Sequence, residues 1–147
     1  YAVENLIKEA EKRNVNRKRL IFAKKLPLKK HLARHTLGDL GLDTFNYNGH
    51  TTTSDALWAG LPVLTKIGKS FAARVSASII TSMGIPELIT NTEEEYEEKA
   101  LYIARNPNEL IRLKSKLVKS RETSPLYNSE LFTRDLEKKF EELVNSI

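Results

Sequence analysis

The sequence contains no cysteine. This absence excludes disulfide bonds, thiolate metal sites and a cysteine nucleophile. It also removes the compositional argument for an oxidising compartment, so we expect a cytoplasmic protein. Long apolar runs are absent as well, since none approaches the ~18 residues that a membrane span requires. Residues 1–20 carry charges throughout, unlike a signal peptide, and we therefore expect no membrane contact.

Motifs of known catalytic chemistry are equally scarce. The sequence has no GxSxG, HExxH or GxGxxG pattern and no cluster of metal-ligating residues. Gly68-Lys69-Ser70 resembles the end of a phosphate-binding P-loop, but Val63 stands where that loop needs its first glycine. We therefore expect a site that uses neither a metal ion nor another cofactor.

Basic residues outnumber acidic ones, 24 against 19, which gives a formal net charge of +5. They are spread over several segments and mixed with acids, so they do not form the patch that nucleic acid requires. A basic cleft for a small anion fits the same charge. The length and the hydrophobic fraction of 40% suit one globular domain, residues 1–147, with C-terminal helices from about residue 106 onward. The start at Tyr1 rather than Met indicates a fragment.

Hydrophobic periodicity predicts short strands separated by helices. The predicted strands are Arg19–Ala23, Leu40–Thr44, Pro62–Thr65 and an edge strand at Glu87–Thr90. The predicted helices are Glu4–Arg13, Leu28–Thr36, Thr51–Ala59, Ser70–Ser82, Thr92–Arg105, Pro107–Glu122 and Ser129–Asn145. Strands joined through such helices pair in parallel by right-handed crossovers, so the fold class is α/β with a partial, doubly wound, Rossmann-like sheet. Trp58 is expected in the core, and Ala72, Ala73, Ser76 and Ala77 predict close helix packing.

The stretch from Gly49 to Asp55 carries the clearest sign of chemistry. It leads from a predicted strand through a glycine turn into a helix, and ligands bind at the carboxyl ends of strands in open α/β sheets. A helix start offers free N–H groups and a partial charge of about +0.5 to an anion. Thr51 and Thr52 add hydroxyl donors, and Asp55, on the same face as Thr51, can accept from ribose hydroxyls. Phosphate donors beside a ribose acceptor describe a nucleotide site.

Two alternatives apply to these residues. Thr52-x-x-Asp55 also matches a capping-box variant, and many helices begin this way without binding a ligand. His50, as a single histidine in a turn, is more often a structural hydrogen-bonding residue than a catalyst. Upstream, His31 and Arg34 share one helix face, where a flat ring could stack on a base and a guanidinium could bind a diphosphate. Their spacing alone is equally typical of a solvated surface.

The motif Asn48-Gly49-His50-Thr51-Thr52, followed by Asp55 and Leu57-Trp58-Ala59-Gly60-x-Pro62, resembles the signature of the O-GlcNAc transferases. That family includes plant Spindly-type proteins, which use fucose. Further matches follow in the same order as in the family: Pro27-x-x-x-His31-x-x-Arg34, Leu42-Asp43-Thr44, Ala72-x-Arg74-Val75-x-Ala77-Ser78, Glu87-Leu88-Ile89 and Ser124-Pro125-Leu126-Tyr127-Asn128. The resemblance covers nearly the whole chain, roughly from Glu4 to Leu143.

This resemblance implies the second, nucleotide-sugar-binding lobe of a GT-B glycosyltransferase. Family members transfer N-acetylglucosamine from UDP-GlcNAc to Ser or Thr hydroxyls of intracellular proteins, with inversion and without a metal. Tetratricopeptide repeats usually precede their catalytic lobes and select the acceptor protein. The matching positions imply that His31 lies beside the uracil with Arg34 as its helical neighbour. They also imply that His50, Thr51 and Thr52 cradle the diphosphate and that Asp55 accepts from the ribose.

Departures from the family pattern qualify this expectation. Leu28 stands where animal enzymes have a lysine that contacts the nucleotide, and Thr53-Ser54 replaces Gly-Met. The family's cleft lysine and the histidine of its first lobe have no counterpart here, so we expect no catalytic residue in this chain and no turnover by it alone. The unpaired edge of the Arg19–Ala23 strand predicts a homo-oligomer. A regulatory or scaffold domain that binds a protein partner remains the alternative, and the sugar (N-acetylglucosamine, glucose or fucose) stays open.

Overall fold

The computed structural model describes residues 1–146. Clustering of the backbone divides the chain into two compact units, Tyr1–His31 and Leu32–Ile147. The first unit holds helix α1 (Ala2–Lys12), the short 3-10 helix η1 (Arg17–Arg19) and the beginning of α2 (Leu28–His35). The prediction of one domain over the whole chain remains a prediction.

The second unit is built on a three-stranded parallel sheet. Strands β1 (Gly41–Leu42), β2 (Val63–Lys66) and β3 (Ile89–Thr90) lie in the order β1-β2-β3, so β3 is an edge strand as predicted. Each crossover between them contains a helix, α3 (Thr51–Trp58) or α4 (Val75–Ser82). The α/β prediction with parallel pairing is confirmed.

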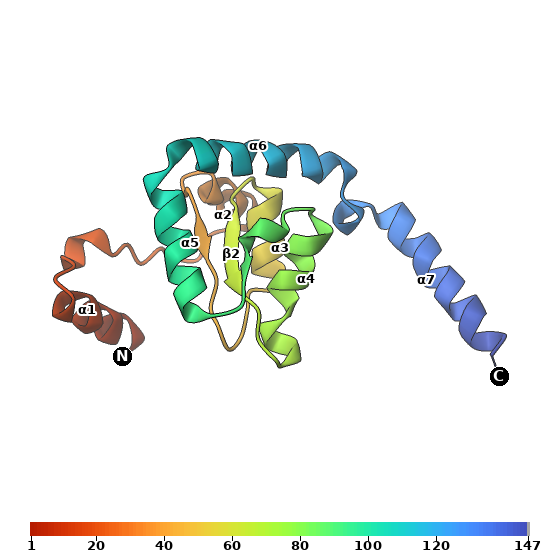
Figure 1. Ribbon diagram of the computed structural model, residues 1–147, viewed down its shortest axis with the longest axis horizontal. Coiled ribbons are helices and arrows are strands. Elements are labelled where there is room, and N and C mark those ends of the chain that lie inside the picture. The colour runs from red at the N-terminus through yellow and green to blue at the C-terminus, as the bar shows by residue number, and fades with distance from the viewer. Residues whose placement is uncertain (147) are drawn as a thin grey trace. The chain divides into compact units, whose positions relative to one another are not determined.

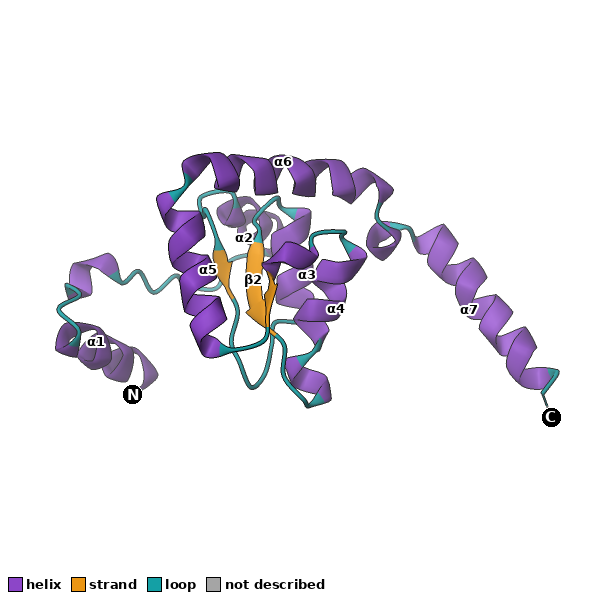
Figure 2. Cartoon of the chain, viewed as in Figure 1, coloured by secondary structure: helices purple, strands orange, loops and turns teal. Residues whose placement is uncertain are grey.

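Helices cover both sides of the central strand. Figure 1 shows α3 and α4 on one side of β2 and α5 (Glu93–Arg105) on the other, with α6 (Pro107–Thr123) along one end of this layer. Figure 2 shows the strands enclosed between these helices. The pattern explains why Val63, Leu64 and Thr65 are buried in succession, because a parallel strand is covered on both faces. The short helices η2 (Phe71–Ala73), η3 (Pro86–Leu88) and η4 (Pro125–Tyr127) and the last helix α7 (Ser129–Val144) complete the unit.

The core lies between the sheet and helices α3 to α6. Its fully buried apolar side chains come from every layer and are Leu57, Leu64, Ile80, Met83, Ile85, Leu88, Ile103, Leu113 and Leu117. Burying one such side chain stabilises the fold by about 1.5–3 kcal/mol relative to leaving it exposed. Strand β2 and the C-terminal half of α3 are therefore anchored in this core.

Glycine ends two of the helices that pack on this core. Gly60 has φ +87° and Gly84 has φ +69°, values that favour glycine over other residues. After α3, the N–H groups of Gly60 and Leu61 donate to the carbonyls of Leu57 and Ala56, and the same pattern closes α4. These are Schellman motifs, which satisfy carbonyls that a helix end would leave unpaired. Gly60 was predicted as the stop of its helix, and this is confirmed.

The predicted strand Arg19–Ala23 is wrong. Arg17–Arg19 form a 3-10 helix, and residues 20–27 belong to neither a helix nor a strand. Ile21, expected inside, is 89% exposed. A strand exists only through hydrogen bonds to a neighbour, and among residues 1–146 this segment has none. The predicted homo-oligomer rested on an unpaired edge at this strand, so that reason for it no longer holds.

Trp58 was expected in the core and is instead 45% exposed. Its ring packs edge-to-face on Tyr127 at 4.9 Å between centroids, and the Arg121 guanidinium lies 5.3 Å above it. Arg121 also donates to the Trp58 carbonyl at 2.9 Å. Its position after Leu57, the fully buried residue of this turn, places the indole at the rim, where it joins α3 to α6 and η4.

The predicted helix Ser70–Ser82 is divided in two. Residues 71–73 form η2, and α4 begins only at Val75. Ser70 caps η2 by accepting a hydrogen bond from the Ala73 amide. Three of the four small residues nevertheless pack closely as predicted, since Ala73, Ser76 and Ala77 are buried, whereas Ala72 is half-buried.

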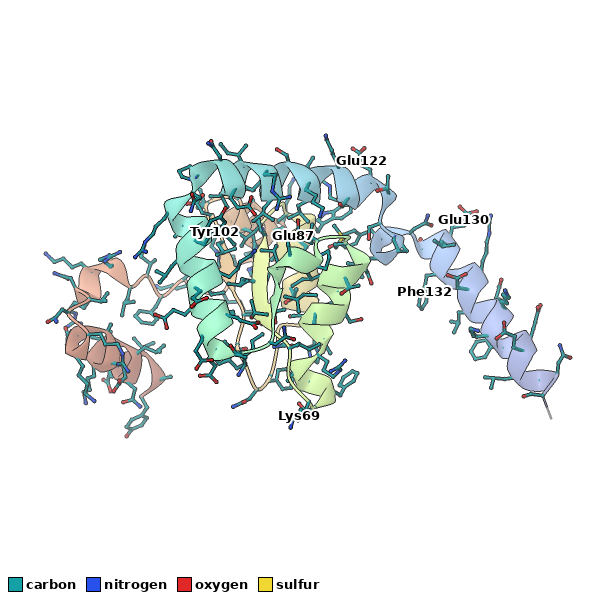
Figure 3. The ribbon with its side chains drawn as sticks, viewed as in Figure 1. Lys69, Glu87, Tyr102, Glu122, Glu130 and Phe132 are labelled. Atoms are coloured by element: carbon teal, nitrogen blue, oxygen red, sulfur yellow. The ribbon has the colours of Figure 1, made fainter. Side chains whose placement is uncertain are left out.

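The last helix, α7, buries none of its side chains. Figure 3 shows Glu130 and Phe132 on this helix, apart from the sheet. No helix within residues 1–146 is long and apolar enough to cross a membrane.

Candidate functional site

The loop between β1 and α3 is organised by the carboxylate of Asp43, the first residue after β1. One oxygen, Oδ1, accepts from the amides of Thr44 at 2.9 Å and Gly49 at 2.7 Å. The other, Oδ2, accepts from the Thr65 hydroxyl at 2.6 Å. The Asp43 side chain thus draws the far end of the loop back to its beginning and ties both to β2.

Gly49 occupies a position that has no room for a side chain. A Cβ atom there would collide with the hydroxyl oxygens of Thr53 and Thr52. The backbone at this point is held on several sides. The Ser76 hydroxyl donates to the Gly49 carbonyl at 2.8 Å, and the Asn48 amide donates to the Ala72 carbonyl at 2.8 Å. Glycine is required here for close packing against α3.

Helix α3 begins without any side-chain cap. His50 is the capping residue, and only its carbonyl takes part, accepting from the amides of Thr53 and Ser54. Within the described chain, the amides of His50, Thr51 and Thr52 donate to no protein group. The first turn contains no acidic residue, and Thr51 and Thr52 are exposed. Free N–H groups together with the helix dipole make this end attractive to an anion.

The capping-box alternative for Thr52 and Asp55 is wrong, because Thr52 lies inside the helix and caps nothing. Asp55 lies one turn further along and is half-buried. The Asp55 charge acts on the neighbouring Tyr127. Burial raises the pKa of the Tyr127 hydroxyl, and the negative charge of the Asp55 carboxylate raises it further. That hydroxyl donates to the Ser54 carbonyl at 2.8 Å. Asp55 therefore remains available as a hydrogen-bond acceptor at the side of the helix start.

The His50 ring is held between two aromatic rings. Tyr47 stacks on it at 4.9 Å with an interplanar angle of 13°, and Phe71 meets it edge-on at 6.0 Å. The ring atom Nε2 is buried and has no hydrogen-bond partner among residues 1–146. Lys69 is a cation in the loop before η2, close in sequence to Phe71. Figure 3 shows Lys69 at the tip of that loop.

A cleft of about 180 Å³ opens beside the α3 start. Its polar lining comes from His35, Asp43, Gly49, Thr52 and Thr53, and its apolar lining from Leu42, Ala56, Leu61 and Val63. A larger hollow of about 460 Å³ lies over β3 and α5, and its charged lining is Glu87, Glu95, Glu98 and Lys99. Three carboxylates against one ammonium group disfavour an anionic ligand there, whereas the helix N-terminus beside the smaller cleft attracts one.

The predicted site residues fall into two groups. Gly49, His50, Thr51, Thr52 and Asp55 come together at the α3 start. His31 and Arg34 both lie in α2, as predicted, but the division between the two compact units falls between them. Arg34 is not among the residues that line the 180 Å³ cleft.

Sequence reasoning missed three residues around this site: His35, Asp43 and Ser76. Asp43 lies at the end of a predicted strand and six residues before the motif glycine, Gly49. An acid at that position could have been recognised from the sequence as part of the site. Ser76 was counted only as a small packing residue, although it is also a hydroxyl donor. Nothing in the sequence pattern distinguished His35, which lines the cleft from the end of α2.

No group of three or more His, Cys, Asp or Glu side chains within residues 1–146 is arranged to hold a metal ion. The polar groups at the α3 start are instead N–H donors, hydroxyls and the carboxylates of Asp43 and Asp55. This set suits an anion that also carries hydroxyl groups.

Comparison with known proteins identifies the family to which this chain belongs. Residues 2–136 match the sequence profile of glycosyl transferase family 41. The chain belongs to this family. A UDP-N-acetylglucosamine–peptide N-acetylglucosaminyltransferase of Caenorhabditis elegans is 32% identical over 134 residues, 91% of this chain. A probable enzyme of the same name from Arabidopsis thaliana, SEC, is 38% identical over 127 residues, 86% of this chain.

A solved family 41 structure has the same fold. An O-GlcNAc transferase variant from Thermobaculum terrenum superposes with a TM-score of 0.88 at 33% identity. That match covers 95% of this chain and 27% of the other. The chain spans 12% and 13% of the length of the C. elegans and Arabidopsis proteins, so it corresponds to one part of a much longer family member.

Proposed function

We propose that this chain is the donor-binding part of a protein O-glycosyltransferase that transfers N-acetylglucosamine from UDP-GlcNAc to Ser or Thr residues. The observation that carries the proposal is the uncapped start of α3, with free amides at His50, Thr51 and Thr52. The names of the family 41 relatives from C. elegans and Arabidopsis support the same class of donor and acceptor. In this proposal the chain is the second lobe of a GT-B enzyme.

Each residue of the site has a distinct role in this proposal. The amides and hydroxyls of Thr51 and Thr52 bind the diphosphate, because an anion at a helix N-terminus meets both donors and a favourable dipole. Asp55, one turn further, accepts from the ribose hydroxyls. The proposal assigns His31 to the uracil and Arg34 to the diphosphate. Gly49 contributes by its lack of a side chain.

The proposal needs no metal ion. The negative charge of the diphosphate is balanced by N–H donors and the helix dipole, and the Asp43 carboxylate that lines the cleft already accepts three hydrogen bonds from the protein. In this proposal the protein acceptor binds to regions of the full-length enzyme that lie outside this chain. Catalysis also requires those regions. The cysteine-free sequence is the basis for proposing a cytoplasmic protein.

Titration calorimetry with UDP, with and without EDTA, tests this proposal. We expect weak binding that EDTA leaves unchanged. Asp55→Ala should weaken binding by about 1.5–3 kcal/mol, the range for a hydrogen bond to a charged group. The melting temperature should change little, because the Asp55 side chain caps nothing.

Asp135→Ala on the exposed face of α7 is the matched control and should leave UDP affinity unchanged. An absolute requirement for Mg²⁺ or Mn²⁺ would contradict the metal-free site. Absence of UDP binding by the wild-type chain would favour the regulatory or scaffold alternative.

A further inference from the structure

The Gly49 backbone is held on both sides by residues outside the motif. Its N–H donates to Asp43 Oδ1 at 2.7 Å, and its carbonyl accepts from Ser76 Oγ at 2.8 Å. We infer that Ser76 is a positioning residue that aims the His50 N–H at the diphosphate, and that Gly49 supplies no amide donor. This inference rests on the proposed function.

The direction of each hydrogen bond around Ser76 follows from counting protons. A serine hydroxyl has one proton, and here it is donated to the Gly49 carbonyl. The 2.8 Å contact between Thr53 Oγ1 and Ser76 Oγ must then use the Thr53 proton. Both side chains are buried, so water does not compete for either bond. The chain of donors from Thr53 through Ser76 to Gly49 therefore has one arrangement.

Peptide geometry carries this constraint to His50. The Gly49 carbonyl and the His50 N–H belong to one planar trans peptide, in which they point in opposite directions. Because Ser76 holds the carbonyl toward α4, the His50 N–H points away from α4. That amide donates to no protein group in the described chain. With Thr51 and Thr52 it completes three adjacent donors.

The Gly49 amide cannot join this set, because Asp43 already accepts from it. Asp43 also accepts from Thr44 and Thr65, so its carboxylate takes three hydrogen bonds in all from its own loop and from β2. These bonds explain how a carboxylate can line the cleft beside an anion site. Its charge is offset by three hydrogen bonds.

The test compares Ser76→Ala with Ser78→Ala, a control on the exposed face of the same helix. Binding of UDP and of uridine is followed by amide NMR. For Ser76→Ala we expect UDP affinity to fall about 3- to 10-fold, the equivalent of one hydrogen bond, while uridine affinity is unchanged. Ser78→Ala should alter neither ligand. In the wild type, UDP should shift the His50, Thr51 and Thr52 amides more than the Gly49 amide.

Ser76→Thr keeps the hydroxyl and serves as the rescue variant. Recovery of UDP affinity by Ser76→Thr supports positioning by the hydroxyl. An equal loss for UDP and uridine in Ser76→Ala, or a UDP-induced shift that is largest at Gly49, would overturn the inference and leave the donor proposal intact. A wild-type chain that does not bind UDP would overturn both.

Discussion

Helices α3 and α5 both begin just beyond the carboxyl end of a strand of the same sheet, and their first turns differ in every respect that matters to an anion. Thr92 caps α5 by accepting from the Glu95 amide at 3.1 Å, and Glu95 accepts in return from the Asn91 amide at 2.8 Å. Three glutamates occupy that first turn. The α3 start has neither a side-chain cap nor an acid.

This difference distinguishes the start of α5, which has a structural role, from the start of α3, which is suited to binding an anion. The hydrogen bonds from Asn91 hold the pKa of Glu95 below its ordinary value, because they stabilise the charged form. At the start of α5, the negative charge that a helix N-terminus favours is therefore supplied by carboxylates of the helix itself. At α3, the donors and the dipole are left for an external group, which is the physical basis of the nucleotide proposal.

The most direct way to break this contrast is to give α3 an acid of its own. In Thr52→Glu, a carboxylate in the first turn occupies the amide donors and repels the diphosphate. We expect UDP affinity to fall about 100-fold, consistent with the loss of one strong charge-assisted contact. Stability should rise by about 0.3–1 kcal/mol, because an acid complements the helix dipole. Calorimetry and thermal melting measure the two effects.

Thr52→Gln is the neutral partner of this variant and separates charge from size. It should retain more affinity than Thr52→Glu and show no gain in stability. If both variants bind UDP as the wild type does, the α3 start is not the diphosphate site.

The reverse experiment weakens the cap of α5. Thr92→Ala removes the acceptor for the Glu95 amide and should destabilise the fold by about 1 kcal/mol, within the usual 0.5–2 kcal/mol for a lost cap. UDP affinity should not change, because no group at α5 is proposed to bind the nucleotide. Urea unfolding gives the stability, and Thr133→Ala on α7, whose hydroxyl bonds only within its helix, is the control. A loss of UDP affinity would mean that the two helix starts are coupled.

The sequence predicted the elements whose partners lie within the second unit. The runs at Leu40–Thr44, Pro62–Thr65 and Glu87–Thr90 each contain a strand, although only two residues of the first and the last are paired. Arg19–Ala23 has the same apolar character and forms none. Local pattern measures the tendency of a segment to pair, but a strand also needs a neighbour in register.

The site was predictable to the same extent. The helix start and its free donors follow from the pattern around Thr51 and Thr52, because they depend on local backbone geometry. The roles of Asp43 and Ser76 depend on distances between segments that are far apart in sequence, such as Ser76 and Gly49. No spacing rule predicts such contacts, so those residues emerge only from the folded structure.

The smallest expected effect concerns Tyr96, the residue of α5 that touches the α3 loop. Its hydroxyl donates to the Asp43 carbonyl at 3.0 Å, and burial, aided by the Asp43 charge, raises the pKa of Tyr96 from 10.0 to about 12. The folded state therefore binds this proton more tightly than the unfolded state does. Its contribution to stability is complete below pH 10 and is lost as the pH rises toward 12.

Tyr96→Phe should thus cost about 0.5–1.5 kcal/mol at neutral pH, the usual value of one hydrogen bond, and the cost should shrink above pH 10. Urea unfolding of both proteins at pH 7, 9 and 10.5 measures the difference, in which the titration of lysines cancels. Tyr102→Phe, on the exposed side of α5, removes a hydroxyl outside this contact and is the control. UDP affinity at pH 7 should fall only slightly, because Asp43 holds the loop through its carboxylate rather than its carbonyl. A large loss of affinity would instead show that α5 sets the geometry of the α3 start, and the contrast between the two helices would then be one of degree.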